Sequence, residues 1–347
     1  MRELRVGVVG ATGAVGRTVV RILEERGLPI AELVAFASPR SEGQRLPFRG
    51  DHVAVRTLTD AWFEGIDLAL ASAGAAVSRQ ALPPAASAGT VCIDLSSAFR
   101  MDPAVPLVIP EINPQALAGH PNLIANGNCT AISALMALAP LHRRFGLRSL
   151  VTSSYQSTSG IGQKCVRELL EQLEKLRGQE ESLAAPDAGA LPAGEVFGRT
   201  IAFNVLPFCE RADPGGSGFT TEELKMGNEA RKVLGIPDLQ VVATAVRVPT
   251  LVGHAVSIYA TFDAPAPAAE ARRALSAFSG VRVVDDLADG SYPTPLDAAG
   301  TDDVLVGRIR NPAGDDRALA LFACGDNLRK GAALNAVQIA ELVVSGG

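Results

Sequence analysis

One cysteine of the chain stands where its thiol could act as a nucleophile. Cys129 follows a short apolar run that ends in Asn126-Gly127-Asn128, and it opens an apolar stretch compatible with a helix to about Leu138. A thiol in the first turn of a helix lies at the positive end of the helix dipole, which lowers its pKa and favours the attacking thiolate. The free N–H groups of that turn could also hold an oxyanion. The alternative is that Cys129 is one more small buried residue, the commonest fate of a free cysteine.

Two further groups with suitable chemistry lie at the junction of two predicted strands. Residues 241–249 and 255–262 have the composition of paired strands, joined by a loop that contains Gly253. Arg247 and His254 therefore flank a strand end and a loop, where catalytic groups are often presented. Imidazole exchanges protons near neutral pH, so His254 is a candidate acid and base, although a lone histidine is more often structural.

A predicted helix from Thr221 carries an acid and a base on one face. Thr221 can cap this helix, and Glu222 suits its first turn. Glu222 and Lys225 are three residues apart, so an ordinary surface ion pair is the alternative to a role in binding. Before this helix, residues 166–176 form an amphipathic helical pattern that is expected to pack on a sheet or a partner subunit, and residues 178–194 are expected to form a surface loop.

The N-terminal segment predicts a site for a dinucleotide. A short buried strand over residues 4–9 is followed by glycines at positions 10, 13 and 16, and then by a helix that stops at Gly27. Glycines between a strand and a helix allow a tight turn and a close approach of the backbone to a pyrophosphate, which then rests on the helix N-terminus. The spacing is G-x-x-G-x-x-G, and the alternative is a glycine turn without a ligand.

The second predicted strand, residues 33–37, favours NADP over NAD. An NAD site usually carries an acidic residue at the end of this strand, whereas an NADP site favours arginine. Here the strand ends in Ser38-Pro39-Arg40-Ser41, whose hydroxyls and guanidinium suit a 2′-phosphate; a solvated surface turn is the alternative. A later buried strand, residues 66–71, ends in Ser72-Ala73-Gly74, and these small residues leave room for a cofactor at the sheet edge.

Composition argues against several other classes of protein. A chain of 347 residues should form about two domains, and 47% hydrophobic with 20% charged residues is ordinary for a soluble enzyme-sized protein. The net charge of −5 gives no electrostatic case for nucleic acid or an anionic membrane. No apolar run approaches the ~18 residues of a membrane span. The five cysteines and four histidines show neither disulfide nor metal-ligand spacing, so we expect no metal site and a cytoplasmic location.

The motifs, taken together and in order, resemble those of the aspartate-β-semialdehyde dehydrogenases. The resemblance rests on the glycine loop, Ser-Pro-Arg-Ser, Ser-Ala-Gly, Asn-Cys-Thr, Tyr-Gln-Ser-Thr-Ser-Gly, Glu-Glu-Leu-Lys-Met, Arg-Val-Pro-Thr-x-x-Gly-His and a closing Asp-Asn-Leu-Arg-Lys-Gly-Ala-Ala. It covers essentially the whole chain. The family's usual Pro-Asn-Cys is Gly127-Asn128-Cys129 here, and the loop before Thr221 is less typical.

The resemblance implies an α/β fold, with a Rossmann-type dinucleotide-binding domain and an α+β catalytic and dimerisation domain. The first domain is expected to span residues 1–128 and 326–347, because the C-terminal helix, from Asn327 to about Val344, returns to it. The second domain is expected to span residues 129–325. The implied enzyme is an NADP-dependent homodimer that reductively dephosphorylates L-4-aspartyl phosphate to L-aspartate 4-semialdehyde. That reaction leads to lysine, by way of diaminopimelate, and to threonine, methionine and isoleucine.

The resemblance also implies roles for individual residues. Cys129 resembles the family's nucleophile, which forms a thioester, and His254 resembles its acid/base catalyst. The expected substrate contacts are Asn128, Gln156 beside the thiol, Arg247 on the α-carboxylate, Glu222 on the ammonium, and Arg100 and Lys225 on the phosphate. The expected cofactor contacts are Gly10, Thr12, Gly13, Ala14, Val15, Ser38, Arg40, Ser41, Ser72, Ala73, Gly74, Ser159, Gly160 and Asn327.

Two other functions stay open on the sequence. N-acetyl-γ-glutamyl-phosphate reductases use the same cysteine and histidine chemistry on a longer, acylated substrate. A free ammonium calls for a carboxylate such as Glu222, which favours the aspartyl substrate. A non-catalytic NADP-binding sensor would keep the glycine loop, but it would have no need for Cys129, His254 and Arg247 together.

Overall fold

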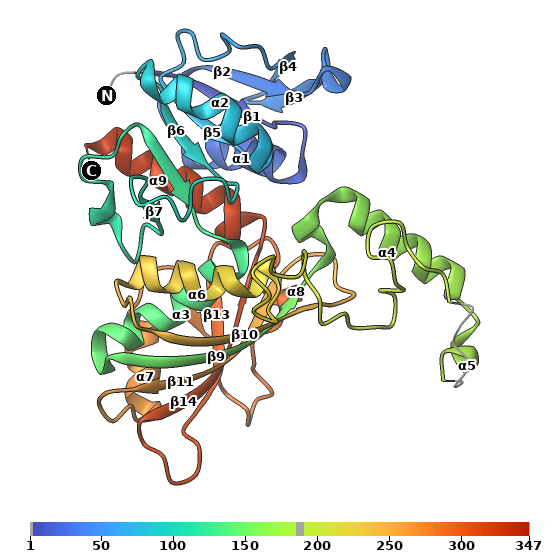
Figure 1. Ribbon diagram of the computed structural model, residues 1–347, viewed down its shortest axis with the longest axis vertical. Coiled ribbons are helices and arrows are strands. Elements are labelled where there is room, and N and C mark those ends of the chain that lie inside the picture. The colour runs from blue at the N-terminus through green and yellow to red at the C-terminus, as the bar shows by residue number, and fades with distance from the viewer. Residues whose placement is uncertain (1–2, 185–190, 347) are drawn as a thin grey trace.

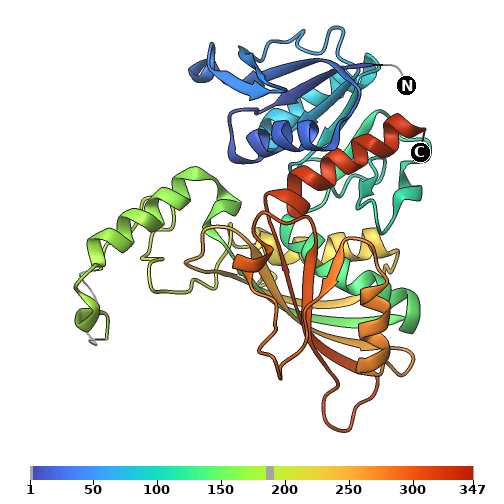
Figure 2. The same cartoon turned by 180° about the vertical axis from the view of Figure 1, so that it is seen from behind.

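The computed structural model describes residues 3–184 and 191–346, which form two units stacked along the long axis of the molecule (Figures 1 and 2). Each unit is built on one sheet, and the described residues supply eight strands to the first sheet and six to the second. Part of the expected surface loop 178–194, namely residues 185–190, lies outside the described residues. So do residues 1–2 and 347 at the limits of the expected first domain.

The first sheet runs in the order β3-β4-β2-β1-β5-β6-β8-β7, and every pair is parallel except β3 with β4. Its strands are β1 (Leu4–Val9), β2 (Ile30–Ala37), β3 (Arg45–Phe48), β4 (Asp51–Thr57), β5 (Leu68–Ala71), β6 (Val91–Asp94), β7 (Leu107–Val108) and β8 (Leu123–Asn126). The chain moves away from β1 in opposite directions along the sheet, to β2 and to β5. Such a switch point leaves a crevice at the carboxyl ends of the strands, where ligands of doubly wound sheets bind.

Helices cover both faces of the first sheet, which explains why β5 is apolar and buried at every position. The helices and short helical turns of this unit are α1 (Ala14–Arg26), η1 (Pro39–Ser41), α2 (Ala75–Ser87), η2 (Pro114–Leu117) and α9 (Leu334–Ser345). The C-terminal α9 packs against α1, β5 and β6 (Figure 2), so the expected return of the last helix to the first unit is confirmed.

The second sheet runs in the order β10-β9-β11-β14-β13-β12. Its strands are β9 (Leu147–Gln156), β10 (Gln240–Arg247), β11 (His254–Phe262), β12 (Val281–Val283), β13 (Val304–Arg310) and β14 (Ala318–Gly325). The expected pairing of β10 with β11 is wrong, because β9 lies between them, parallel to β10 and antiparallel to β11. The loop after Arg247 therefore crosses over the end of β9, and brings His254 next to residues that follow Gln156.

Helices of the second unit gather on one face of its sheet (Figure 1). They are α3 (Cys129–Phe145), α6 (Thr221–Leu234) and α7 (Ala268–Ser276), which contact the strands directly. The remaining helical segments are η3 (Thr158–Ile161), α4 (Gln163–Leu176), α5 (Glu180–Leu183), α8 (Pro295–Ala298) and η5 (Arg329–Ala333). The short α8 contacts β14 in a separate apolar cluster. Helix α4 projects away from both sheets in Figure 1, and the four residues of α5 lie within the stretch that was expected to be loop.

Two helix starts differ from the sequence-based prediction. The cap of α6 is Thr220 and not Thr221: its side chain accepts the N–H of Glu223, whose carboxylate returns to the N–H of Thr220. The last helix begins at Leu334 and not at Asn327, because a π-helical turn, η5, precedes it. Wider π-helical turns are frequent at functional sites, and η5 lies against the start of α3.

Candidate active site

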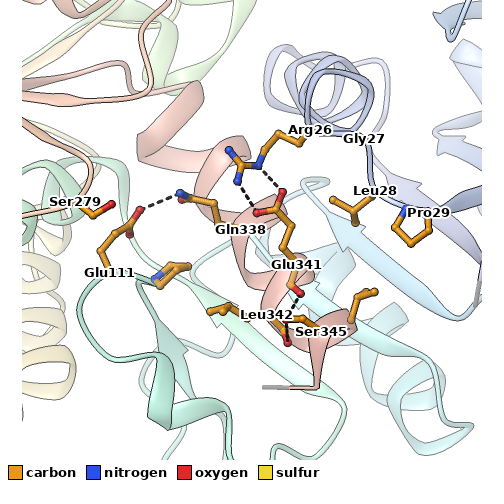
Figure 3. Close-up of a pocket in the computed structure, with 12 residues that line it drawn as sticks. Arg26, Gly27, Leu28, Pro29, Glu111, Ser279, Gln338, Glu341, Leu342 and Ser345 are labelled. Carbon is orange, nitrogen blue, oxygen red and sulfur yellow. Dashed lines mark hydrogen bonds and ion pairs between the residues drawn. The ribbon is translucent and has the colours of Figure 1, made fainter. Parts of the chain in front are cut away.

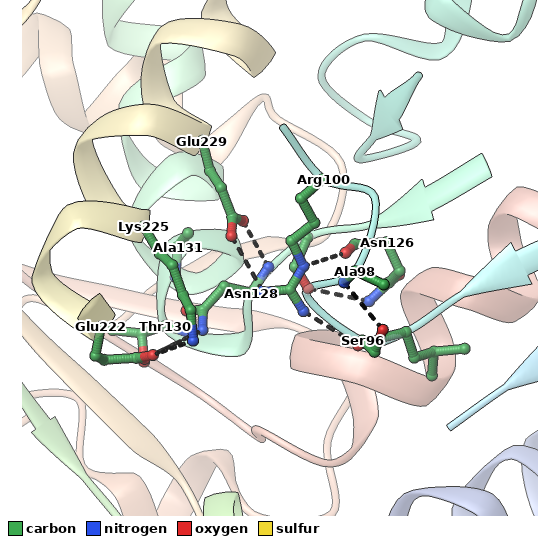
Figure 4. Close-up of polar contacts among 12 residues, drawn as sticks. Ser96, Ala98, Arg100, Asn126, Asn128, Thr130, Ala131, Glu222, Lys225 and Glu229 are labelled. Atoms are coloured by element: carbon green, nitrogen blue, oxygen red, sulfur yellow. Dashed lines mark hydrogen bonds and ion pairs between the residues drawn. The ribbon is translucent and has the colours of Figure 1, made fainter. Parts of the chain in front are cut away.

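Asn128 and Cys129 mark the point where the chain passes from the first sheet into the second unit. β8 ends at Asn126 and α3 begins at Cys129, so the predicted helix start is confirmed. Asn128 caps α3: its Oδ1 accepts hydrogen bonds from the backbone N–H groups of Thr130 (2.9 Å) and Ala131 (3.1 Å), as Figure 4 shows. The thiol is therefore held in the first helical position, at the positive end of the helix dipole.

The environment of Cys129 disfavours the thiolate in the ligand-free molecule. Burial and the carboxylate of Glu222 raise the pKa of the Cys129 thiol to about 11. The charges of Arg100 and Arg247 and a hydrogen bond with Thr130 oppose this rise without cancelling it. The expectation of a lowered thiol pKa is therefore wrong for this state, because desolvation of the charged form outweighs the helix dipole.

Removing the negative charge of Glu222 should make Cys129 more reactive. In Glu222→Gln the carboxylate that raises the pKa of the thiol is gone, so the thiolate fraction at pH 8 rises. Alkylation of Cys129 by iodoacetamide, followed by mass spectrometry, should accelerate about threefold or more. Glu210→Gln is the matched control, because Glu210 pairs with Lys225 but is not among the groups that shift the pKa of Cys129. Equal alkylation rates in the two variants would contradict the assigned cause.

Glu222 is a buried hydrogen-bond acceptor at the start of α6. Its carboxylate accepts from Nδ2 of Asn128 (3.1 Å) and from Nε2 of Gln156 (3.2 Å). It also accepts from Nζ of Lys225 (3.1 Å). Burial would raise the pKa of Glu222, but the charge of Lys225 and these hydrogen bonds outweigh burial and lower the pKa. The alternative of an ordinary surface ion pair is wrong, because Glu222 is only 8% exposed.

Lys225 joins two carboxylates, those of Glu222 and Glu210. Burial lowers the pKa of Lys225, but the two carboxylates together outweigh burial, so the net direction is upward and the ammonium stays charged. The side chain is part of the cavity wall, where a phosphate could compete with the carboxylates for its N–H donors.

Arg100 is fixed near the start of α3 (Figure 4). Its Nε donates to the carbonyl oxygen of Asn126 (2.8 Å), and its Nη2 donates to that of Leu95 (3.1 Å). Its Nη1 donates to Glu229 (3.1 Å), which in turn accepts the backbone N–H of Asn128 (2.6 Å). Burial raises the pKa of Glu229, and the charge of Arg100 opposes it. Since a guanidinium has five N–H donors, two remain for a ligand.

Arg247 is a buried cation without a carboxylate partner. It ends β10 and is 4% exposed. Its Nη1 donates to the carbonyl oxygen of Ser157 (2.6 Å), and its Nε has no hydrogen-bond partner. Within the described part of the chain, no ion pair includes Arg247. An unpaired buried guanidinium is costly, so this position is suited to an anionic ligand such as a carboxylate.

His254 begins β11 and is fully buried beside Arg247. Its Nδ1 accepts a hydrogen bond from the backbone N–H of Ser157 (3.1 Å), and its Nε2 has no partner. A Cβ at Gly160 would lie 3.0 Å from this Nε2 and 3.3 Å from Nη1 of Arg247, so glycine keeps the space above both groups open. Burial and the charge of Arg247 lower the pKa of His254 to about 3, so the ring is neutral at physiological pH.

Most of the expected cofactor residues lie at the carboxyl ends of β1, β2 and β5; Ser159, Gly160 and Asn327 lie beside His254 in the second unit. Gly10 has a φ of +83°, and a Cβ there would lie 2.9 Å from the nitrogen of Ala73. A Cβ at Gly16 would lie 2.2 Å from the carbonyl oxygen of Gly10, so only glycine lets α1 approach the turn this closely. The hydroxyls of Thr12 and Ser41 are 3.2 Å apart, which brings together two motifs that are about 30 residues apart in the sequence.

The start of α1 is open to an anion. Its N-cap, Gly13, makes no side-chain hydrogen bond, and the first turn contains no acidic residue. The N–H groups of that turn are therefore free to bind a pyrophosphate. Ser38 and Arg40, which were expected to favour a 2′-phosphate, are exposed at η1.

A cavity of about 380 Å³ joins the two groups of expected residues. The expected site residues on its wall are Val15, Gly74, Arg100, Asn128, Cys129, Gln156, Gly160, Glu222, Lys225, Arg247, His254 and Asn327. The expected cofactor residues that are not on its wall are Gly10, Thr12, Gly13, Ala14, Ser38, Arg40, Ser41, Ser72, Ala73 and Ser159. All of these except Ser159 lie in the turns after β1, β2 and β5, so the cavity opens towards the glycine turn.

A second cavity, of about 560 Å³, lies between α1 and α9 (Figure 3). None of the expected site residues lines it, and its charged groups already have partners: Arg26 pairs with Glu341, and Glu111 pairs with Lys330 and accepts from Gln338 (2.9 Å). The smaller cavity is therefore the candidate active site.

The described residues contain no cluster able to hold a metal ion. They also include no helix that is both long and apolar enough to cross a membrane.

Four residues of the site were not assigned from the sequence. Glu210 lines the cavity and pairs with Lys225, and Glu229 holds the N–H of Asn128. Ser157 contacts His254, and Gly331 of η5 lies against Cys129. The sequence did contain a signal for Glu229, which is seven residues from Glu222 and so on the same face of α6. The other three depend on contacts between distant segments.

Comparison with known proteins defines the class. Two protein-family models match the chain. The family model described as semialdehyde dehydrogenase, NAD binding domain, matches residues 5–120, and the family model described as semialdehyde dehydrogenase, dimerisation domain, matches residues 138–330. The protein is thus a semialdehyde dehydrogenase by class, and the second match supports a homodimer.

Relatives narrow the class further. An aspartate-semialdehyde dehydrogenase of Mycolicibacterium smegmatis is 47% identical over 99% of both chains, and one of Prochlorococcus marinus is 42% identical over 99% of this chain and 97% of the relative. A solved structure of aspartate semialdehyde dehydrogenase II from Vibrio cholerae, complexed with ASA, is 38% identical, with a TM-score of 0.92 over 100% of this chain and 99% of that one. The chain belongs to the aspartate-semialdehyde dehydrogenase family. Members of this family are oxidoreductases of amino-acid biosynthesis.

Substituting Gly331 with alanine should displace the thiol. A Cβ at this position would lie 3.0 Å from Cβ and 3.3 Å from Cα of Cys129, so η5 would push against the first residue of α3. We expect kcat to fall by about tenfold to 10²-fold, because small displacements of a reacting group are costly. Steady-state kinetics measure the loss, and thermal unfolding checks the fold. Gly215→Ala, in an exposed turn, is the control; a kcat within about twofold of it would show that η5 does not constrain the thiol.

Proposed function

We propose that this chain catalyses the NADPH-dependent reductive dephosphorylation of L-4-aspartyl phosphate to L-aspartate 4-semialdehyde through a thioester on Cys129. The product feeds the synthesis of lysine, threonine, methionine and isoleucine. The observation that carries the proposal is the single cavity in which Cys129, His254 and the unpaired Arg247 lie together, open towards the glycine turn. The relative from Vibrio cholerae was solved with ASA bound, which supports the same substrate class.

Charge complementarity selects the substrate in this proposal. The free Nε of buried Arg247 binds the α-carboxylate, and Glu222 binds the α-ammonium. Gln156, whose Nε2 donates to Glu222, lines the same cavity as the thiol and positions the substrate beside it. Arg100 and Lys225 supply the cations for the phosphate, since each keeps N–H donors in addition to those used on Glu229 and Glu222. An acylated amine would leave Glu222 without a cationic partner from the substrate.

Substrate binding also activates the thiol. The carboxylate of Glu222 raises the pKa of Cys129 in the ligand-free molecule, and a substrate ammonium placed against Glu222 cancels much of that effect. The thiolate then attacks the acyl carbon. The C–S bond forms, the C–O bond to phosphate breaks, and phosphate leaves with the bonding electrons. In the net reaction the departing phosphate takes up the proton that the thiol has lost. The backbone N–H groups at the start of α3 stabilise the oxyanion of this addition.

The residues around the glycine turn fit a dinucleotide for two reasons. Gly10 and Gly16 let the turn pack closely against Ala73 and the start of α1, and the first turn of α1 has no side-chain cap, so its N–H groups can bind a pyrophosphate. We assign NADP to this site, with Ser38, Arg40 and Ser41 on the 2′-phosphate. When bound, the reduced nicotinamide supplies the hydride that brings the thioester to the aldehyde level. The thiolate of Cys129 is the leaving group when the aldehyde departs. His254 acts beside the acyl oxygen as the acid, through the N–H of its ring.

Arg40→Ala tests the assignment of NADP. Loss of a guanidinium that binds the 2′-phosphate should lower kcat/KM for NADP by about tenfold or more and leave kcat/KM for NAD unchanged. Arg56→Ala, another exposed arginine of the first unit, is the control. A parallel loss with both cofactors would place Arg40 outside the 2′-phosphate site.

We also propose the boundaries and the assembly of the two domains. The dinucleotide domain comprises residues 1–128 and 326–347, and the catalytic and dimerisation domain comprises residues 129–325.

The homodimer forms through the face of the second sheet opposite α3 and α6. On that face Val151 lies beside Val242 and Tyr259 on neighbouring strands, and these side chains are 47%, 53% and 38% exposed. Contiguous exposed apolar side chains are typical of interaction surfaces.

We place the enzyme in the cytoplasm. All five cysteines are free thiols, and four of them are buried. A chain without a disulfide framework suits a reducing compartment.

The decisive experiment follows NADPH absorbance with aspartate semialdehyde and NADP, with and without inorganic phosphate. Phosphate-dependent formation of NADPH supports the acyl-phosphate reaction and the substrate together. A signal with N-acetylglutamate semialdehyde, but none with aspartate semialdehyde, would transfer the assignment to the N-acetyl-γ-glutamyl-phosphate reductase reaction. Absence of signal with both, in a folded chain that binds NADP, would overturn the catalytic assignment.

A further inference from the structure

Ser157 holds one nitrogen of His254 with two of its own polar groups. The backbone N–H of Ser157 donates to Nδ1 over 3.1 Å, and the hydroxyl oxygen lies 3.1 Å from the same Nδ1. Both residues are completely buried. Ser157 directly follows β9, and His254 begins β11, so the contact depends on the antiparallel pairing of these strands.

The backbone N–H fixes the tautomer of the neutral ring. An N–H group can only donate, so the hydrogen bond to Nδ1 requires a lone pair on that atom. The proton of the neutral imidazole is then on Nε2, the ring atom without a protein partner in the cavity. In the neutral ring, a proton on Nδ1 would take this acceptor from the buried N–H of Ser157 and leave two N–H donors 3.1 Å apart, whereas Nε2 can carry the proton without that cost.

A second polar residue stands behind the hydroxyl of Ser157. Oδ1 of Asn327 accepts from this hydroxyl (3.1 Å) and from the N–H of Gly253 (2.9 Å), while its Nδ2 donates to Ser159 (3.0 Å). The side chain of Asn327, which was expected to contact the cofactor, is thus used to hold the loop of His254. With its proton directed to Asn327, the oxygen of Ser157 has lone pairs available for an N–H at Nδ1.

We propose that Ser157 is the positioning residue of His254. Its backbone N–H keeps the neutral ring protonated on Nε2. Its hydroxyl, which donates to Asn327, accepts a hydrogen bond from the Nδ1–H whenever the ring is a cation. The role of the ring in the reaction rests on the proposed function, but its tautomer does not.

The consequence for catalysis is that His254 enters the reaction as a hydrogen-bond donor. Its Nε2–H can stabilise an oxyanion on the acyl carbon, both when the thiolate adds and when the thioester is reduced. It cannot take the proton of Cys129 at Nε2 while that atom already carries one. No covalent bond of His254 or Ser157 forms or breaks in this role, so the reaction is the thioester chemistry described above.

The surroundings of the ring oppose a positive charge. Burial and the charge of Arg247 beside the ring disfavour the cation. The other charged or titratable groups on the cavity wall are Cys129, Arg100, Lys225 and the carboxylates of Glu210 and Glu222. Among the described residues, the atoms that hydrogen-bond Nδ1 belong to Ser157. A backbone hydrogen bond with Gly253 also favours the cation. The side-chain acceptor at Nδ1 is the hydroxyl of Ser157, which makes this hydroxyl open to test.

The tautomer can be read in the ligand-free protein by ¹⁵N NMR of histidine-labelled chain. The chain has four histidines, and His254→Gln identifies the signals of interest. We expect the neutral ring to show a protonated Nε2 and an unprotonated Nδ1. A protonated Nδ1 would overturn the proposal, whatever the activity assays show, because the measurement needs neither substrate nor cofactor.

The series of hydrogen bonds from His254 through the hydroxyl of Ser157 to Asn327 is tested by placing a negative charge at position 327. In Asn327→Asp a carboxylate replaces the amide, and a ring that is linked to it through Ser157 should titrate about one to three pH units higher by the same NMR signals. In the double variant Asn327→Asp with Ser157→Ala the rise should be lost, whereas Asn327→Asp with Ser157→Thr, which keeps the hydroxyl, should retain it. A rise that persists without the hydroxyl, or no rise in the single variant, would overturn the role of Ser157.

Discussion

Replacing Cys129 with alanine is expected to lower kcat by about 10⁴-fold or more while NADP still binds. Cys129 is half-buried and lines the cavity, whereas the four other cysteines, Cys92, Cys165, Cys209 and Cys324, are buried. Thioester formation therefore has no substitute nucleophile, and loss of a nucleophile removes most of the rate enhancement of such enzymes. The expected dinucleotide contacts lie mainly in the turns after β1, β2 and β5, and do not depend on the thiol.

Two measurements separate chemistry from binding in this variant. NADPH absorbance in the presence of aspartate semialdehyde and phosphate gives kcat, and fluorescence titration with NADPH gives the dissociation constant. Cys92→Ala is the matched control, since Cys92 is a buried cysteine of the first sheet outside the cavity. Turnover above about 1% of the parent would contradict the role of Cys129 as nucleophile, and so would loss of cofactor binding in a folded variant.

Replacing Arg247 with leucine is expected to lower kcat/KM by about 10²-fold or more. The guanidinium is buried, its Nε has no hydrogen-bond partner among residues 3–184 and 191–346, and a substrate carboxylate would supply the missing anion. Removing one partner of a buried charge pair costs about 2–5 kcal/mol of binding free energy. Arg247→Lys should restore little of the activity, because a lysine cannot reproduce the planar fork that grips a carboxylate.

The same substitution should not weaken the fold. A buried cation without a carboxylate partner destabilises the folded state, so an apolar side chain of similar size should leave the free energy of unfolding unchanged or raise it by about 1 kcal/mol. Denaturant unfolding of Arg247→Leu and of the control Arg273→Leu, an exposed arginine of α7, measures this. A marked loss of stability in Arg247→Leu alone would show that the guanidinium holds the fold and is not kept for a ligand.

The parts of the site that came from the sequence are local. The start of α3 at Cys129 follows from the Asn128 cap and the apolar run after it, and the dinucleotide crevice follows from glycines placed between a strand and a helix. Both depend on residues within a few positions of one another, where capping and backbone conformation decide the outcome. The order of the motifs along the chain was enough to indicate the family.

Helix and strand boundaries were less well predicted where two local signals competed. Thr220 and Thr221 can both cap a helix, and the capping box with Glu223 selects Thr220. The strands on either side of the loop before His254 looked like a hairpin, but β9, from nearly a hundred residues earlier, lies between them. Sequence adjacency of two strands does not fix their pairing when a third strand offers longer ladders to both.

Sequence alone determined which groups could do chemistry, and the tertiary structure decided how each of them is charged and held. The pKa of Cys129 rises because burial and Glu222, which is 93 positions away, outweigh the helix dipole. The hydrogen bond from Ser157 to His254, from which we infer the tautomer, and the contact of Arg247 with Ser157 form only when β9, β10 and β11 come together. Desolvation and directed hydrogen bonds act over a few ångströms in space, so they are invisible until the fold brings distant residues into contact.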